Sequence, residues 1–184
     1  MAGSSALENI VDLNNVVRQY ESALLRYVAQ LIGSSSDDVE DVVQDAFIKL
    51  HNQVSKHGND SVKHMSSWLF RVAHNLAMDA GRRRSRRARL QEKVTVDPVI
   101  NPGETAKDNE PSQELEQREA CNLAMSELQQ LPEEQKSVLL LKIIQGFTLR
   151  EISEVTGLKI GTVNYRLTQG LRELSQRLKQ VGAI

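Results

Sequence analysis

The stretch GFTLREISEVTGLKIGTVNYRL (residues 146–167) contains two short helical patterns separated by a glycine. The first pattern has the spacing of a capping box, in which the side chains of Thr148 and Glu151 each accept a hydrogen bond from the other residue's backbone N–H. Gly157 allows a tight turn, and the second pattern starts at about Ile160. These features predict a helix-turn-helix, whose second helix enters the major groove of DNA. A buried helical hairpin with a solvated outer face gives the same signals, so both interpretations stay open here.

The outer face expected for the second helix has the chemistry of a base reader. Asn and Gln amides pair with adenine, an Arg guanidinium pairs with guanine, and Thr contacts a thymine methyl group or a phosphate. A glycine near the helix start would let the backbone approach DNA closely. The outward residues are Lys159, Gly161, Thr162, Asn164, Tyr165, Arg166 and Gln169.

Three further helices are predicted in the first half of the chain. Apolar residues recur at helical spacing over 13–31 and 39–54, and again from about Ser66 to Asp79. The outer face of the second helix is acidic, and by default such a face is solvated. The third helix leads into six arginines between Arg82 and Arg89. So many cations repel one another, which favours phosphate binding over a solvated tail.

A linker is predicted after the arginine run. Residues 91–112 hold three of the four prolines and several acids. Helical pattern resumes near Gln113, and Pro132 is expected at the N1 position of a helix that Gly146 ends. Its apolar stripe would include Val138, Leu139, Leu141 and Ile144. No window alternates at period two long enough to require a strand.

The fold class follows from these patterns. We predict an all-α protein with two small helical modules, a three- or four-helix module at 10–90 and a helix-turn-helix module at 113–180. A flexible acidic linker at 91–112 joins them. The net charge supports this division, because it is +2 over residues 1–91, −8 over 92–134 and +5 over 135–184.

The composition excludes several classes of protein. Apolar residues reach 40% but aromatic residues only 4%, so the core must be aliphatic. The single cysteine, Cys121, excludes an internal disulfide framework and favours the reducing cytoplasm. No apolar run is long enough to cross a membrane, and the start lacks signal-peptide features. No nucleophile–base pair or phosphate loop occurs, and His51, His57 and His64 lack further metal-ligand spacing. We therefore expect no enzyme, cofactor or metal site.

Four segments carry a resemblance to a known family: DDVEDVVQDAFIKL (37–50), SSWLFRVAHNLAMDAGRRR (66–84), LQQLPEEQKSVLLL (128–141) and FTLREISEVTGLKIGTVNYRLTQGLREL (147–174). In this order they are similar to the successive segments of the extracytoplasmic-function sigma factors, compact members of the sigma-70 family. The resemblance covers about residues 13–90 and 113–179. It implies a factor that binds bacterial core RNA polymerase and directs promoter-specific initiation.

The resemblance also implies site residues. The expected docking face for the coiled coil of the polymerase β′ subunit is Glu40, Asp41, Gln44 and Asp45. The expected contacts to the −10 promoter element, with an unstacked base in a pocket walled by the loop within 51–64, are Arg71, His74, Asn75, Arg82, Arg83, Arg84, Arg86 and Arg87. The expected −35 contacts are Thr148, Arg150, Lys159, Gly161, Thr162, Asn164, Tyr165, Arg166 and Gln169. Further expected partners are the β flap and an anti-sigma factor.

Two other functions are alternatives to a sigma factor. A stand-alone helix-turn-helix regulator would bind duplex DNA tightly without polymerase, and it gives no role to the acidic helix face. A helical adaptor without DNA contact leaves the arginine run unexplained.

Overall fold

The computed structural model describes residues 13–33, 36–58, 61–91 and 112–182. Every regular element within these ranges is a helix, so the predicted all-α class is confirmed. The predicted linker lies almost wholly outside the described residues. Within the described ranges, no helix combines the length and apolarity needed to cross a membrane.

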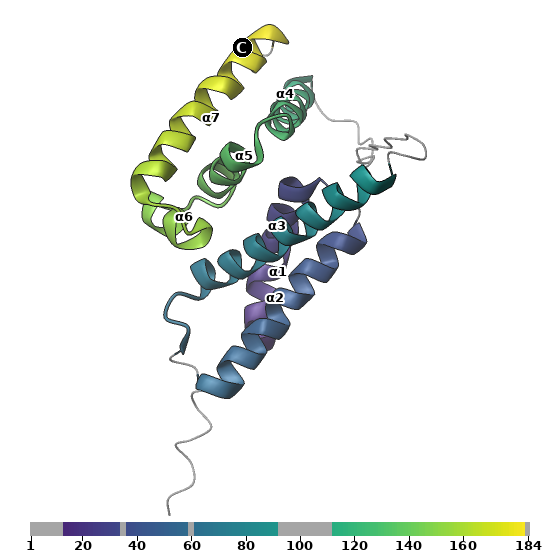
Figure 1. Cartoon of the computed structure of the whole chain (residues 1–184). Helices are drawn as coiled ribbons and strands as arrows, with labels where there is room; N and C mark the ends of the chain where they lie inside the picture. Colours follow the sequence, from purple (N-terminus) through teal and green to yellow (C-terminus); the bar gives the residue numbers. More distant parts are fainter. Residues whose placement is uncertain (1–12, 34–35, 59–60, 92–111, 183–184) are drawn as a thin grey trace, which may run out of the picture.

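The N-terminal module consists of three long helices, drawn in purple to teal in Figure 1. They are α1 (Leu13–Ile32), α2 (Ser36–His57) and α3 (Met65–Gln91). Each packs against both others. The apolar face predicted for α2 is confirmed, because Val39, Val42, Val43, Ala46 and Leu50 are buried.

The third helix differs from expectation in two ways. It continues without a break through the arginine run to Gln91, so the run belongs to a helix. Its buried side also differs from prediction. The apolar spacing predicts that the inward side chains are Met65, Trp68, Leu69, Val72, Ala73 and Leu76. Leu69 and Ala73 are buried as predicted, but Phe70 and His74 are buried as well, whereas Trp68 is only half-buried. This happens because α3 is covered by α1, α2 and α6 on different sides, so no single narrow stripe describes its buried surface.

The C-terminal module, in green and yellow in Figure 1, contains shorter helices. They are α4 (Ser112–Gln129), α5 (Glu133–Leu139), the π-helix η2 (Leu140–Ile144), α6 (Leu149–Thr156) and α7 (Ile160–Gln180). The helix-turn-helix formed by α6 and α7 has the predicted bounds. The expectation for Pro132 is wrong by one position: it is the N-cap of α5, which begins at Glu133.

The π-helix explains a second wrong expectation. The backbone N–H of Gln145 donates to the carbonyl of Leu140, five residues back, at 3.3 Å. Such a wide turn adds a residue to the helical turn and changes which side chains face inward. Ile144, expected on the buried stripe, is therefore 41% exposed. Gly146 ends the element at a φ of 71°, as predicted for a helix-terminal glycine.

The two modules pack against each other. Helix α6 lies against α3, and α1 contacts both α5 and η2. The ring of Phe147, in the segment before α6, meets the ring of Phe70 edge-on at 5.0 Å between centroids. Phe70 in turn lies 5.4 Å from the ring of Tyr27. The buried core is therefore continuous from one module into the other.

Candidate nucleic-acid interface

The acidic face of α2 is solvent-exposed. Glu40, Asp41, Gln44 and Asp45 are all exposed and alternate with the buried valines of the same helix. Helical periodicity places them together, because residues three and four apart are neighbours on one face. The side chains form a contiguous acidic surface that is open to a basic partner.

The next candidate residues lie near the middle of α3 and divide into two kinds. Arg71 and Asn75 are exposed, as expected for side chains that touch DNA. His74 is only 7% exposed, and its Nδ1 is hydrogen-bonded to the Tyr27 hydroxyl at 2.9 Å. In this structure His74 joins α3 to α1 and does not face solvent, contrary to the expected DNA contact.

Burial also alters the ionisation of this pair. It lowers the pKa of His74 to about 4, and the nearby Arg82 guanidinium acts in the same direction. Burial raises the pKa of the Tyr27 hydroxyl. Both groups are therefore neutral at physiological pH, as a buried hydrogen-bonded pair requires.

We expect His74 to make the stability of the protein pH-dependent. Its folded pKa of about 4 lies below the ordinary value of 6.5. The unfolded chain binds more protons between these values, so stability is full above pH 6.5 and falls as pH drops toward 4. The loss should reach about 3 kcal/mol, as measured by urea unfolding at several pH values. His74→Gln should be less stable at pH 7 and should show a flatter pH profile; an unchanged profile would contradict this reading.

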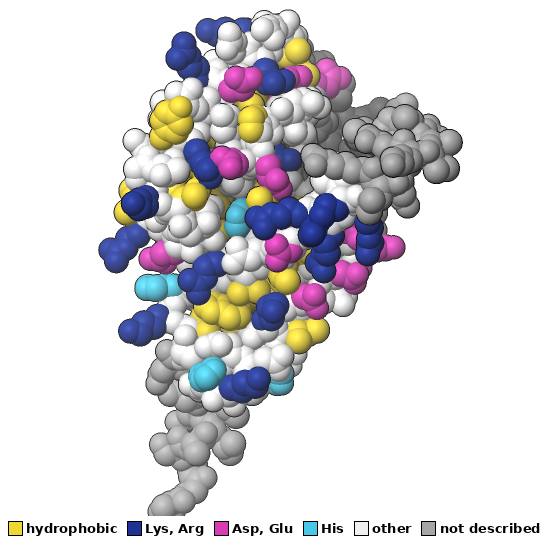
Figure 2. Space-filling model, viewed as in Figure 1, with side chains coloured by type: hydrophobic (Ala, Val, Ile, Leu, Met, Phe, Trp, Pro, Cys, Tyr) yellow, Lys and Arg dark blue, Asp and Glu magenta, His cyan; other side chains and the backbone are white. Residues whose placement is uncertain are grey.

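The arginine run forms a cationic stretch of α3. Arg82, Arg83, Arg84, Arg86 and Arg87 are all exposed, and only Arg82 has an ion pair among the described contacts of this group, to Asp79 at 3.4 Å. Figure 2 shows Lys and Arg side chains gathered over the second half of α3. A helical cationic surface can follow a phosphate backbone at fixed spacing.

Removing two of these cations should weaken DNA binding regardless of sequence. For Arg83→Ala/Arg86→Ala, we expect the slope of log affinity against log salt to become shallower by about 1.5, since each lost phosphate contact removes 0.7–0.9 of slope. Promoter binding by the polymerase complex, titrated with salt, measures this. Arg18→Ala on α1, an exposed arginine outside the run, is the matched control. Equal slopes in the parent, the double variant and the Arg18→Ala control would show that Arg83 and Arg86 do not contact phosphates.

A cavity of about 280 Å³ lies beside the start of α3. Ser61, Val62, Lys63 and His64, from the segment before α3, form one wall. Trp68 and Arg71 form part of the other wall, and Glu154 of α6 also lines the cavity. The expected loop is shorter than 51–64, because α2 continues to His57. Its cationic and aromatic lining suits an unstacked base.

The capping box at the start of α6 is confirmed. The Thr148 backbone N–H donates to the Glu151 carboxylate at 2.8 Å, and the Glu151 N–H donates to the Thr148 hydroxyl at 3.3 Å. The hydrogen bond from the Thr148 backbone lowers the pKa of Glu151. Gly157 follows with a φ of 72°, which sets the turn before α7. Thr148 and Arg150 are both exposed beside this cap.

The candidate base readers of α7 do not all face outward. Lys159, Gly161, Asn164 and Tyr165 are exposed, and Thr162 and Gln169 are half-buried. The Arg166 side chain is only 23% exposed and forms an ion pair with Glu134 of α5 at 2.6 Å. Arg166 was expected on the outer face with the others, but it points toward α5 in this structure.

Two sequence profiles match the chain. The profile described as Sigma-70 region 2 covers residues 16–87, and the one described as Sigma-70, region 4 covers residues 122–174. The chain belongs to the sigma-70 family. It is a sigma factor of the extracytoplasmic-function type, and the region 2 match falls within α1–α3 while the region 4 match runs from α4 into α7.

Individual relatives agree with this. The sigma factor is 26% identical over 183 residues to the ECF RNA polymerase sigma factor SigW of Bacillus subtilis, covering 96% of this chain and 90% of the relative. Its fold resembles that of RpoE from Bartonella quintana, solved with the anti-sigma factor NepR, at a TM-score of 0.69 and 21% identity over 92% of this chain and 98% of that chain. CnrH, solved with the cytosolic domain of CnrY, gives a TM-score of 0.61 and 24% identity, over 91% and 88% of the two chains.

Three residues of this sigma factor were missed by sequence reasoning: Phe70, Glu134 and Phe147. Phe70 and Phe147 contact each other between the modules, and Glu134 holds Arg166. The sequence could have indicated only the two phenylalanines, because in a chain with 4% aromatic residues each aromatic side chain is a candidate for the core. Nothing in the local pattern links Glu134 to a residue 32 positions later.

Proposed function

We propose that this sigma factor binds bacterial core RNA polymerase and directs promoter-specific initiation by recognising −10 and −35 elements and helping to melt DNA. The observation that carries the proposal is the separation of charge on the N-terminal module. An exposed acidic face on α2 and an exposed cationic stretch of α3 belong to the same rigid three-helix unit. One surface suits a protein partner and the other suits DNA.

The residues divide accordingly. We assign residues 10–90 to region 2, 91–112 to a linker and 113–180 to region 4. In region 2 the face with Asp41 and Asp45 binds the β′ coiled coil, and Arg71, Asn75 and the arginines of α3 hold the −10 DNA. In region 4 the exposed residues Lys159, Asn164 and Tyr165 reach the −35 element. The factor catalyses no reaction and acts in the cytoplasm, where its polymerase works.

Two further partners belong to this proposal. Region 4 contacts the β flap of the polymerase, and an anti-sigma factor restrains the protein. A complex of this kind is the solved state of RpoE from Bartonella quintana, whose fold this chain shares. Pull-down from cells carrying a tagged copy, followed by mass spectrometry of the bound proteins, identifies the restraining partner.

In vitro transcription with purified core polymerase tests the main function. The protein should co-purify with core and should start transcripts from promoters that core alone ignores. If it does neither, the sigma-factor function fails. Tight binding to a duplex operator without polymerase would instead support a stand-alone helix-turn-helix regulator.

We expect Asn164→Ala to alter −35 discrimination specifically. Asn164 is exposed on α7, and its amide is suited to a bidentate contact with adenine. Its loss should lower the free energy of discrimination at one base pair by about 1–3 kcal/mol and should leave binding to core polymerase unchanged. Transcription from a set of −35 point variants measures the change in preference. A uniform loss on every template would indicate a phosphate contact or a folding defect.

A further inference from the structure

Helix α7 carries two kinds of side chain on opposite sides. Val163, Gly170 and Leu174 are buried and form a stripe at helical spacing, which faces the rest of the C-terminal module. Asn164 and Tyr165 are exposed on the other side, where they can reach DNA. The rotation of α7 about its own axis therefore decides where these candidate base readers point.

The close contact at Gly170 does little to fix this rotation. A Cβ added there would lie 2.9 Å from Leu139 Cδ1, so the backbone of α7 comes close to α5 at this point. Helices usually hold each other through side chains that form ridges and fit into grooves, and a glycine has no such side chain. The contact at Gly170 therefore sets the distance between α5 and α7 and adds little resistance to rotation.

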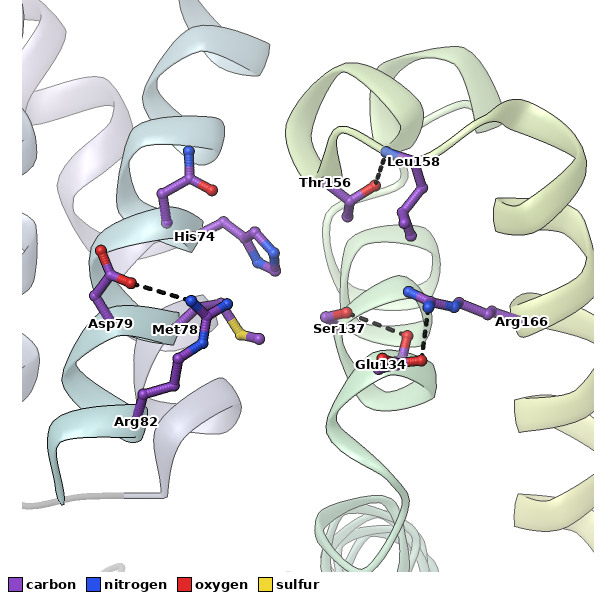
Figure 3. A pocket seen from close by; sticks show the side chains of 10 residues that line it. His74, Met78, Asp79, Arg82, Glu134, Ser137, Thr156, Leu158 and Arg166 are labelled. Atoms are coloured by element: carbon purple, nitrogen blue, oxygen red, sulfur yellow. Dashed lines mark hydrogen bonds and ion pairs between the residues drawn. The ribbon is translucent and has the colours of Figure 1, made fainter. Parts of the chain in front are cut away.

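Arg166 supplies a directional contact one helical turn before Gly170. Its side chain is 23% exposed, and its guanidinium pairs with the Glu134 carboxylate of α5 at 2.6 Å. Figure 3 shows the two side chains extending toward each other from their helices. An Arg–carboxylate pair has a preferred geometry, because the guanidinium donors lie in one plane. The pair therefore ties one side of α7 to the first turn of α5.

Small rotations of α7 would matter for base recognition. With its side chains an α-helix has a radius of about 5–6 Å, so a rotation of about 20° moves an outer side chain by about 2 Å. The donor–acceptor distance of a hydrogen bond varies by only about 0.5 Å. A bidentate contact between Asn164 and adenine needs two such bonds at once. A rotation of this size would therefore break the contact and the discrimination that depends on it.

We propose that the Glu134–Arg166 pair positions the recognition helix α7, by fixing its rotation so that Asn164 and Tyr165 face the −35 bases. The inference rests on the proposed function and adds to it a residue of α5 that touches no DNA. Arg166 is here a positioning residue and makes no base contact. Glu134 is 66% exposed, and an ion pair with so exposed a partner adds little to stability. Loss of the pair therefore leaves the fold intact and changes the choice of base.

Glu134→Ala tests this in the complex with core polymerase. Each protein is mixed with core polymerase and a pool of templates randomised upstream of the transcription start, and the templates held in initiation complexes are sequenced. The readout is the enrichment of the preferred −35 sequence over its single-base variants. We expect this enrichment to fall about fivefold, which corresponds to about 1 kcal/mol. Binding to core polymerase and the melting temperature should equal those of the parent.

Glu133→Ala is the matched control. It removes the same charge from the same turn of α5, and its side chain is exposed as well. Any effect of the lost acid on the helix dipole or on the phosphates of DNA should therefore be similar in both variants. The control should keep the enrichment of the parent. An equal fall in both variants would overturn the positioning role.

The exchange Glu134→Arg/Arg166→Glu separates positioning from direct contact with DNA. Arg166→Ala alone should lower the enrichment as much as Glu134→Ala, because each variant removes the same pair. The exchange restores a pair in the opposite direction, so the enrichment should return to within about twofold of the parent. If Arg166 contacted a base itself, the exchange would place a carboxylate against DNA and the enrichment would stay low. A folded exchange variant without recovery would overturn the inference.

The same measurements separate this inference from the proposed function. A parent protein that selects no template with core polymerase would overturn the sigma-factor function, and the inference with it. A parent that selects a −35 sequence, together with unchanged enrichment in folded Glu134→Ala, would overturn the positioning role alone. Glu134→Gln keeps the size of the side chain and gives the same readout if the alanine variant loses stability.

Discussion

Asp41→Lys/Asp45→Lys is expected to abolish binding to core polymerase. The two carboxylates lie four residues apart on the exposed face of α2, so reversing both replaces an acidic surface by a basic one. Against a basic partner this turns attraction into repulsion at the centre of the contact. We expect affinity to fall at least about 100-fold, or about 3 kcal/mol, and promoter-specific transcripts to disappear. Co-purification with core and in vitro transcription measure both effects.

The control for this variant is Glu21→Lys. Glu21 is an exposed acid on α1, outside the proposed docking face, and its reversal should leave core binding within about twofold. The double variant should also have the melting temperature of the parent, because both replaced side chains are exposed on the surface of α2. Retained core binding by a folded Asp41→Lys/Asp45→Lys protein would exclude α2 as the docking helix.

Gly170→Leu is expected to destabilise the C-terminal module strongly. Gly170 is buried where α7 crosses α5, and a Cβ placed there would lie 2.9 Å from Leu139 Cδ1 and 3.3 Å from Gln135 Cβ. Leu139 is fully buried, so any shift of its side chain would disturb the packed core around it. A leucine should therefore destabilise the module by about 3 kcal/mol or more, with a fall in melting temperature of more than about 10 °C. Calorimetry of the full chain measures the shift.

The same helix offers the matched control. Gly161 is exposed and has nothing within 4 Å of an added Cβ, so a side chain there starts in open space. Gly161→Leu should leave stability unchanged or raise it by about 0.5–1 kcal/mol, because glycine is a poor helix former. A large loss of stability in both variants would show that α7 tolerates leucine at neither glycine. A small loss of stability in both would exclude a tight crossing at Gly170.

Local chemistry made parts of this protein predictable. The capping box at Thr148 and the left-handed Gly157 depend on residues within a few positions, and both formed as expected. The buried face of α2 was predictable because it faces a single core, which preserves the simple period of its valines.

The predictions of side-chain exposure that proved wrong concern His74, Arg166 and Ile144. His74 became buried because Tyr27 of α1 accommodates it, and Arg166 turned inward because Glu134 of α5 lies within reach. The exposure of Ile144 follows from a wide helical turn that the apolar period of this segment does not encode. For His74 and Arg166 the outcome depends on a partner that is distant in the sequence, and the local sequence pattern carries no information about that partner.

The unbroken course of α3 has a mechanical consequence. Arg71 and Arg87 lie on one continuous helix, and the 16 residue steps between them, at 1.5 Å each, span about 24 Å. That length corresponds to about seven base steps of duplex at 3.4 Å each. Under the proposed function, this one helix fixes the distance between the DNA contacts of Arg71 and Arg87. Inserting one residue between them would rotate Arg87 by about 100° about the helix axis relative to Arg71.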